Sequence, residues 1–238
     1  KDNRRYQGQM VIKEAIAHSI NCVAVRVLDM ITPQASYSFL HDTLGFEHLN
    51  QADIDYAPLA LGGMNGGVTV REMAAGYTIF ANNGKFSGSR TYTKVLDSEG
   101  NTLIDNSQLV AVNAFKNEKT AYYMLDCLKE VTNSGTGTKA SIPNIETAGK
   151  TGTTTSKRDV WFCGLTPYYV GATWFGYDQS YNLDGISGNT ALSLWTAVMR
   201  RIHADLPAAD FDMGNDSNFV YADYCVDSGM APIDACED

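Results

Sequence analysis

The stretch Ala148-Gly149-Lys150-Thr151-Gly152-Thr153-Thr154 is the most informative part of this chain. It lies in a predicted strand at 146–154, and a second predicted strand at 159–166 follows after a short turn. Small residues flank Lys150, and Gly152, which lacks a side chain, lets the strand lie flat against its neighbours. The pattern predicts a strand that presents one cation and several hydroxyl groups at a binding site.

The residue types in this stretch suit recognition of a peptide that ends in a carboxylate. An edge strand can pair with the backbone of such a peptide, and Lys150 supplies positive potential for its carboxylate. Thr151 and Thr153 alternate along the strand, so their hydroxyls share a face and can bind the same group. Gly152 lies between them without a side chain, and the backbone N–H of Thr153 can donate to a developing oxyanion.

The remaining pattern predicts both helices and strands, with an antiparallel sheet that a helix can cover on one face. Short turns between the predicted strands 146–154, 159–166 and 169–177 require antiparallel pairing. A hairpin is expected at 90–105 with its turn at 98–101, and a glycine-rich loop at 60–67. Helices are expected at 11–18, 22–30, 33–44 after the cap Thr32, 70–81 after a capping box of Thr69 and Glu72, 117–132 and 189–203.

Composition excludes several classes of function. The 238 residues are 44% hydrophobic and carry a formal net charge of −9, so no basic face is expected and nucleic acid is not a predicted partner. No run of 18 apolar residues is present to span a membrane. The loop at 60–67 lacks the Gly-Lys-Ser/Thr ending of a phosphate-binding loop, and the four histidines lack metal-ligand spacing. A nucleotide site and a histidine-based metal site are therefore not expected, and the histidines are interpreted as surface or hydrogen-bonded residues; the family resemblance given below likewise implies no metal or organic cofactor.

The cysteines fall into two groups. Cys22, Cys127 and Cys163 lie in apolar contexts and are interpreted as small buried residues. Cys225 and Cys236 bracket a turn-rich segment of the acidic tail, where a disulfide and two unpaired thiols are both open interpretations.

A second motif, Ser19-Ile20-Asn21, lies at a break between two apolar helical segments. It precedes the predicted strand 146–154, called the lysine strand below because it contains Lys150, by about 130 residues. Ser-x-Asn is common, and it recurs here at 180–182 and 187–189. A hydroxyl and an amide at a corner between helices can point into a cleft. The simpler alternative is that Ser19 only caps the following helix.

Several blocks of the chain resemble class A penicillin-binding proteins in the right order. They are 14–25, 68–77, 81–85, 135–138, 149–154, 159–164 and Thr166-Pro167. Lys-Thr-Gly and Ser-x-Asn are the family's third and second motifs, and its first motif, Ser-x-x-Lys, is absent because no serine here has a lysine three residues later. The resemblance implies an α+β fold, the penicillin-binding and serine β-lactamase-like transpeptidase fold, incomplete at the N-terminus. In that fold helices cover the antiparallel sheet, and a mainly helical lobe forms the other wall of the cleft. The chain also begins without Met, which suggests a fragment of a longer protein.

The resemblance also implies a reaction and its residues. It implies peptidoglycan D,D-transpeptidation on D-Ala-D-Ala stem peptides through a serine acyl-enzyme, with β-lactams as inhibitors. Ser19 would relay a proton to the leaving amine, Asn21 would bind the substrate carbonyl, and Lys150 would be the site's cation. Thr151, Gly152 and Thr153 would bind the terminal carboxylate.

What the chain lacks is expected upstream. There the resemblance places the nucleophilic serine and its lysine, two strands of the sheet, a membrane anchor and a glycosyltransferase domain. The protein would then lie on the outer face of a bacterial cytoplasmic membrane, and this fragment alone would be inactive. Residues 1–206 would belong to the transpeptidase domain and 207–238 to the tail.

Two other functions stay open on the same fold. One is a non-catalytic penicillin-binding-like scaffold or peptide sensor. The other is a serine β-lactamase, which is disfavoured because its deacylating carboxylate motif cannot be placed in this sequence.

Overall fold

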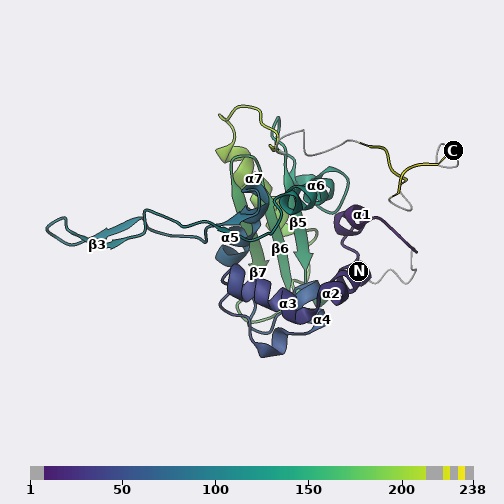
Figure 1. Cartoon of the computed structure of the whole chain (residues 1–238), viewed down its shortest axis with the longest axis horizontal. Coiled ribbons are helices and arrows are strands. Elements are labelled where there is room, and N and C mark those ends of the chain that lie inside the picture. The colour runs from purple at the N-terminus through teal and green to yellow at the C-terminus, as the bar shows by residue number, and fades with distance from the viewer. Residues whose placement is uncertain (1–7, 213–221, 226–229, 234–238) are drawn as a thin grey trace.

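The computed structural model describes residues 8–212, 222–225 and 230–233, and it places a three-stranded sheet between helices (Figure 1). The helices are α1 (Ile12–Ala17), α2 (Asn21–Ile31), α3 (Pro33–Ser38), α4 (Tyr56–Leu61), α5 (Val70–Ala81), α6 (Lys119–Asn133) and α7 (Thr190–Ile202). The strands are β1 (Lys85–Phe86), β2 (Lys94–Leu96), β3 (Thr102–Asp105), β4 (Val112–Asn113), β5 (Ala148–Thr153), β6 (Asp159–Leu165) and β7 (Val170–Gly176). Short helical turns occur at Phe39–Thr43, Gln51–Asp53, Thr138–Ala140 and Thr155–Lys157.

The sheet has the order β5-β6-β7, and both strand pairs are antiparallel as predicted. Lys150 pairs with Cys163 and Thr153 pairs with Val160. Within the described part of the chain β5 is an edge strand, so one side of its backbone is not paired in this sheet. The lysine strand therefore has the edge position that peptide pairing requires.

Helices cover both faces of the sheet, whereas the sequence pattern predicted a helix on only one face. Phe162 of β6 packs edge-on against Trp195 of α7, with ring centroids 5.0 Å apart. Leu165, three residues later, faces the opposite way and packs with Leu125 of α6. Because side chains alternate along a strand, these contacts place α7 on one face and α6 on the other.

A pair of glycines brings β5 and β6 close to the aromatic core. Gly149 and Gly164 are opposite each other in the register. A Cβ on Gly149 would lie 2.6 Å from the Phe162 ring, and one on Gly164 would lie 2.6 Å from Phe162 and 2.7 Å from Trp195. The Phe162 ring therefore occupies space that any other residue at these positions would need.

The helical lobe is built from α2, α3 and α4 with the connections that follow them (Figure 1). Asp53 is fully buried here, and its carboxylate accepts hydrogen bonds from the backbone N–H groups of Asn50 and Asn65. Burial works against the charged form, but these donors lower the pKa of Asp53 below its usual range. Thr69 caps α5 and forms the predicted capping box with Glu72.

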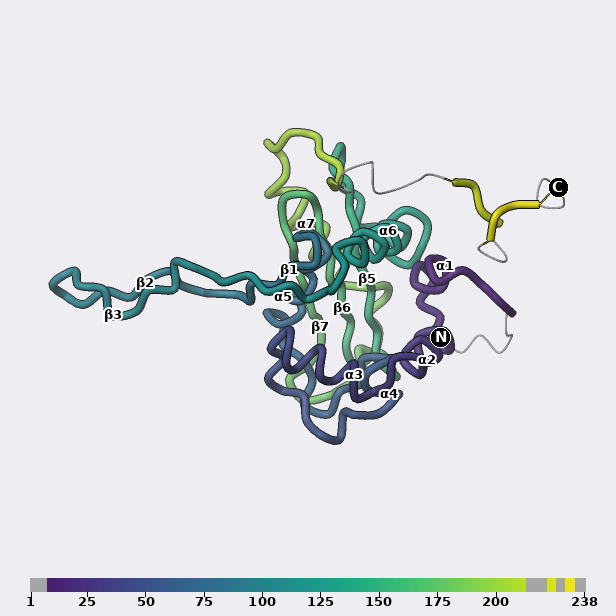
Figure 2. Tube along the Cα trace, in the orientation of Figure 1, coloured from purple at the N-terminus to yellow at the C-terminus, as the bar shows by residue number. Residues whose placement is uncertain are grey.

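A long hairpin projects away from the body of the molecule (Figure 2). Its strands β2 and β3 are joined by the predicted turn, and an ion pair of 3.3 Å links Lys94 to Asp105. Regular pairing begins at Lys94 rather than at residue 90. The short pair β1 and β4 forms the base of the arm and was not predicted.

Other expectations from sequence need correction. The helix expected at 33–44 becomes a π-helical turn after Ser38. Tyr56–Leu61 is an α-helix that was not predicted, so the glycine-rich loop begins at Gly62 rather than at residue 60. Cys22 is exposed and Cys127 half-buried, so only Cys163 of the three cysteines is a fully buried side chain.

The packed part of the chain extends to Phe211, which is buried beside α6 and whose N–H donates to Glu146 at 2.8 Å. Cys236 lies outside the described residues, so a disulfide with Cys225 and two unpaired thiols both stay open interpretations.

Candidate active site

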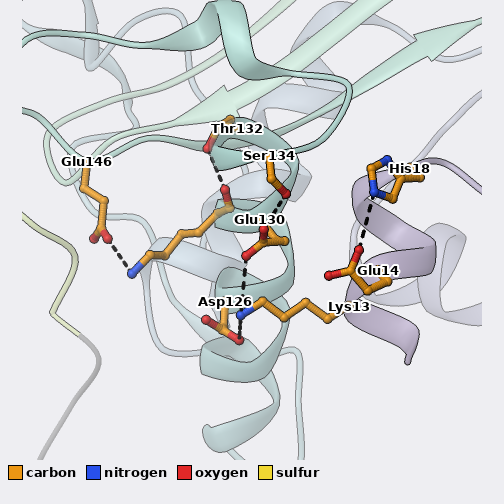
Figure 3. A network of polar contacts seen from close by, with 9 residues as sticks. Lys13, Glu14, His18, Asp126, Glu130, Thr132, Ser134 and Glu146 are labelled. Carbon is orange, nitrogen blue, oxygen red and sulfur yellow. Dashed lines mark hydrogen bonds and ion pairs between the residues drawn. The ribbon is translucent and has the colours of Figure 1, made fainter. Parts of the chain in front are cut away.

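Ion pairs fix the helix that leads into the Ser-x-Asn motif. Lys13 of α1 contacts Asp126 of α6 at 3.0 Å and Glu130 at 3.6 Å (Figure 3). Partial burial opposes its charge, but the two carboxylates raise the pKa of Lys13 above its usual value. Because α6 also packs on β5, this contact holds the end of α1 in a defined place beside the lysine strand.

Ser19 occupies the corner between α1 and α2 in a left-handed conformation, with φ of 57°. Left-handed backbone is uncommon for a residue other than glycine and often marks a functional position. The N-cap residue of α2 is Ile20, and in the part of the chain that the structure describes no side chain caps that helix. The alternative that Ser19 is a helix cap is therefore wrong.

The structure brings the two motifs into direct contact across 131 residues of sequence. Nζ of Lys150 donates a hydrogen bond to Oγ of Ser19 at 2.9 Å. The same ammonium donates to the backbone oxygen of Thr151, also at 2.9 Å. Two of its three donors are thus engaged, and Ser19 receives a hydrogen bond that leaves its own proton free to be donated.

Burial changes the protonation of Lys150. Desolvation lowers the pKa of Lys150 from 10.5 to about 8. At neutral pH most of the population is therefore still charged, yet the amine is near its titration point. Opposite it in the sheet, burial raises the pKa of the Cys163 thiol to about 12, which makes Cys163 unsuitable as a nucleophile.

This shift makes a prediction about stability. Between pH 8 and about 10.5 the unfolded chain binds more protons at Lys150 than the folded chain does, so the Lys150 contribution to the free energy of unfolding should rise with pH in that interval. Denaturant unfolding of wild type and Lys150→Ala at pH 7, 9 and 10.5 measures it. Wild type should gain relative to the variant as pH rises, and a constant difference between them would contradict the shift.

The other predicted residues on β5 have different surroundings. Thr151 is half-buried, and its hydroxyl lies 2.7 Å from the hydroxyl of Thr136. A Cβ on Gly152 would lie 3.1 Å from Cβ of Trp161 on the neighbouring strand. Thr153 is exposed at the end of β5. Its exposure leaves the hydroxyl accessible to a ligand.

The turn after β5 is held by a network that sequence reasoning missed. The Asp159 carboxylate accepts hydrogen bonds from the Thr154 hydroxyl and from Nε1 of Trp174, both at 3.0 Å. The Asp159 N–H donates back to the Thr154 hydroxyl at 2.8 Å. The sequence offered one indication of this network. Asp159 lies five residues after Thr154, at the start of the next strand, where its carboxylate can reach the turn.

Asn21 is the first residue of α2 and is exposed. Within the described part of the chain, no hydrogen bond joins its side chain to Lys150 or Ser19. Asn21 therefore lies two residues after Ser19 in the sequence, but its side chain makes no hydrogen bond to Ser19 or Lys150 in the described structure.

Other candidate sites are weaker. A hollow of about 410 Å³ lies beside α5, lined partly by Glu47, His48 and Arg71, but Glu72 at its edge is already used in the capping box. His203 is buried and hydrogen-bonded to Thr166 at 2.9 Å, as expected for a structural histidine. Among the residues that the structure describes, no three His, Cys, Asp or Glu side chains gather as metal ligands would.

Comparison with known protein families identifies the family of the chain that carries this site. The penicillin-binding protein transpeptidase domain matches residues 1–179, which include both motifs and the contact between them. The chain belongs to this family. The match confirms the resemblance to class A penicillin-binding proteins seen in the sequence.

Curated members of the family are similar over most of the chain. Penicillin-binding protein 1A of Clostridium botulinum is 36% identical over 206 residues, which are 85% of this chain and 24% of that protein. Penicillin-binding protein 1A of Clostridium acetobutylicum is 34% identical over 232 residues, 97% of this chain and 28% of that protein. The chain thus spans about a quarter of the length of these relatives.

Solved structures confirm the fold. Penicillin-binding protein 1A from Haemophilus influenzae superimposes with a TM-score of 0.77 at 21% identity, over 97% of this chain and 39% of that one. PonA1 from Mycobacterium tuberculosis gives a TM-score of 0.70 at 20% identity, over 84% and 58% of the two chains.

The described residues contain no helix with the length and apolarity needed to cross a bilayer.

Proposed function

We propose that this chain is part of a peptidoglycan D,D-transpeptidase that cross-links D-Ala-D-Ala stem peptides through a serine acyl-enzyme and is acylated by β-lactams. The observation that carries the proposal is the 2.9 Å hydrogen bond from Lys150 to Ser19, which joins two family motifs at the edge of β5. The substrate would lie along that edge, with its terminal carboxylate near Lys150, Thr151, Gly152 and Thr153.

The contact also supports a role for each group. In the acylation step the nucleophilic serine would give its hydroxyl proton to the lysine of its own motif, and its oxygen would bond to the carbonyl carbon. The bond to the terminal D-Ala nitrogen breaks, and that nitrogen takes a proton through Ser19, which is reprotonated in turn from that lysine. Ser19 accepts from Lys150, so its own proton is available for the leaving amine. Lys150 supplies a positive charge for the carboxylate and the transition state, and the Thr153 N–H stabilises the oxyanion. Asn21 would bind the substrate carbonyl once the upstream part of the site is in place.

The nucleophile is proposed to lie upstream, in a Ser-x-x-Lys motif of the full-length protein. Relatives of whose length this chain spans only about a quarter support the existence of such a segment. A membrane anchor and a glycosyltransferase domain would lie there too, which would put the site on the outer face of the cytoplasmic membrane. No cofactor is needed, because side chains supply both the nucleophile and the proton transfers.

A non-catalytic scaffold or peptide sensor is the alternative, and it shares every feature of this chain. It differs in the upstream segment, where the scaffold would lack the nucleophilic serine.

Covalent labelling tests the proposal. Full-length protein mixed with labelled penicillin should gain one adduct in denaturing mass spectrometry, whereas residues 1–238 alone should gain none. Absence of an adduct on the full-length protein would favour the scaffold. A stoichiometric adduct on the 238-residue chain would refute the upstream nucleophile.

A further inference from the structure

The turn at 134–137 contacts both halves of the proposed site. The Thr136 N–H donates to the carbonyl of Ala17, the last residue of α1, at 3.1 Å. The Thr136 hydroxyl lies 2.7 Å from the hydroxyl of Thr151, the residue after Lys150. We propose that Thr136 is a positioning residue, which orients the Thr151 hydroxyl so that it donates to the substrate carboxylate. The inference rests on the proposed function and adds to it a residue to which the sequence gave no role.

The backbone, rather than the Thr136 side chain, holds this turn in place. A Cβ on Gly135 would lie 2.3 Å from the Ala17 carbonyl oxygen, so only glycine lets the turn approach α1 this closely. The Gly137 N–H donates to the carbonyl of Val131 at 2.8 Å, which ties the turn to the end of α6. Removal of the Thr136 hydroxyl should therefore leave the turn where it is.

Hydroxyl chemistry gives this contact a direction. Each threonine hydroxyl has one proton to donate and two lone pairs that accept. If Thr151 gives its proton to a carboxylate, the proton between the two hydroxyls must come from Thr136. That donation also polarises the Thr151 O–H bond and strengthens its hydrogen bond to the anion. Without Thr136, the Thr151 hydroxyl rotates freely and loses this preference.

The test is stopped-flow acylation of the full-length protein by penicillin, resolved into the dissociation constant of the first complex and the acylation rate constant. Thr136→Val removes the hydroxyl and keeps the branched shape. It should weaken the first complex by about tenfold, the scale of one hydrogen bond to a charged group, and change the rate constant less. Thr136→Ser restores the hydroxyl and should restore binding.

A double-mutant cycle separates positioning from general damage. In a Thr151→Val background the orienting effect has no target, so adding Thr136→Val should cause no further weakening. Thr132→Val is the matched control, because Thr132 (labelled in Figure 3) also has a hydroxyl engaged in hydrogen bonds, whose proton is shared between the backbone oxygens of Thr147 at 2.6 Å and Lys129 at 2.8 Å. It should lower the melting temperature while the folded enzyme binds penicillin as wild type does.

The inference and the proposed function can fail separately. If wild type forms no adduct, the proposed function is wrong. If wild type forms an adduct and Thr136→Val binds penicillin as tightly as wild type does, Thr136 is not a positioning residue. The same conclusion follows if Thr136→Val raises the dissociation constant of the first complex by the same factor in the Thr151→Val background as in wild type. Should Thr136→Val fail to fold, Thr136→Ala adds no new atoms and carries the same test.

Discussion

Replacing Lys150 with alanine should lower the second-order rate of acylation of the full-length protein by penicillin at least about 100-fold. The ammonium donates to Ser19 and lies on the strand that would bind the substrate, so its loss removes the positive charge and frees the Ser19 hydroxyl to rotate. Lys150→Arg should keep part of the rate, because the charge survives but the compact geometry does not. Stopped-flow acylation of wild type and both variants measures these differences.

Stability distinguishes a site lysine from a structural one. Burial lowers the pKa of Lys150 to about 8, so its charge is disfavoured in the folded state and its removal should not destabilise the protein at pH 7. Lys139→Ala is the matched control, since Lys139 is an exposed lysine in the turn before β5 and should leave the rate unchanged. If Lys150→Ala acylates at the wild-type rate, β5 does not carry the third motif. If it unfolds the protein, the lysine is structural and the site assignment fails.

The second large effect is expected at Gly149. Gly149→Ala should destabilise the fold by about 3 kcal/mol, at the upper end of the usual cost of overpacking. The new Cβ would lie 2.7 Å from the backbone oxygen of Cys163 and 3.0 Å from Cα of Gly164. Backbone atoms cannot rotate away as a side chain does, so β5 and β6 must separate. Thermal and denaturant unfolding measure the change.

A glycine in open space provides the comparison. Apart from its chain neighbours, no atom of the described residues lies within 4 Å of the Cβ position of Gly63, and its φ is not left-handed. Gly63→Ala should therefore change the free energy of unfolding by no more than about 0.5 kcal/mol. Equal melting temperatures for Gly149→Ala and wild type would show that the two strands are less closely packed than these distances indicate. The pairing of Gly149 with Gly164 makes a matching loss expected for Gly164→Ala.

The sequence could predict the elements whose causes are local. Hydroxyl and carboxylate side chains at Thr69 and Glu72 satisfy the first backbone N–H groups of α5, and that information lies within four residues. Short turns likewise require β5, β6 and β7 to pair antiparallel. The helix α4 was missed because it has six residues, although Asp55 caps its start and Gly62 ends it in a left-handed conformation.

Predictions that depend on packing fared less well. The apolar sequence of α2 suggested that Cys22 is buried, but Leu28 is the helix residue that reaches the core and Cys22 is exposed. Helical periodicity identifies an apolar surface without identifying which side of it another element covers. The Asp159 network was missed for a similar reason, because Trp174 reaches that carboxylate from another strand.

The candidate site shows the same division. The sequence by itself predicted the family, which the comparisons confirm, and the strand that contains Lys150, because residue types at fixed spacings carry that information. It also gave the candidate site residues, which are Ser19, Asn21, Lys150, Thr151, Gly152 and Thr153. Only the tertiary structure decided that Lys150 bonds to Ser19 and that Thr136 bonds to Thr151. The first contact joins residues that are 131 positions apart in the sequence, and the second joins residues that are 15 positions apart. Both depend on how α1, α6 and the sheet pack together, and side-chain packing of that kind has no local signature in the chain.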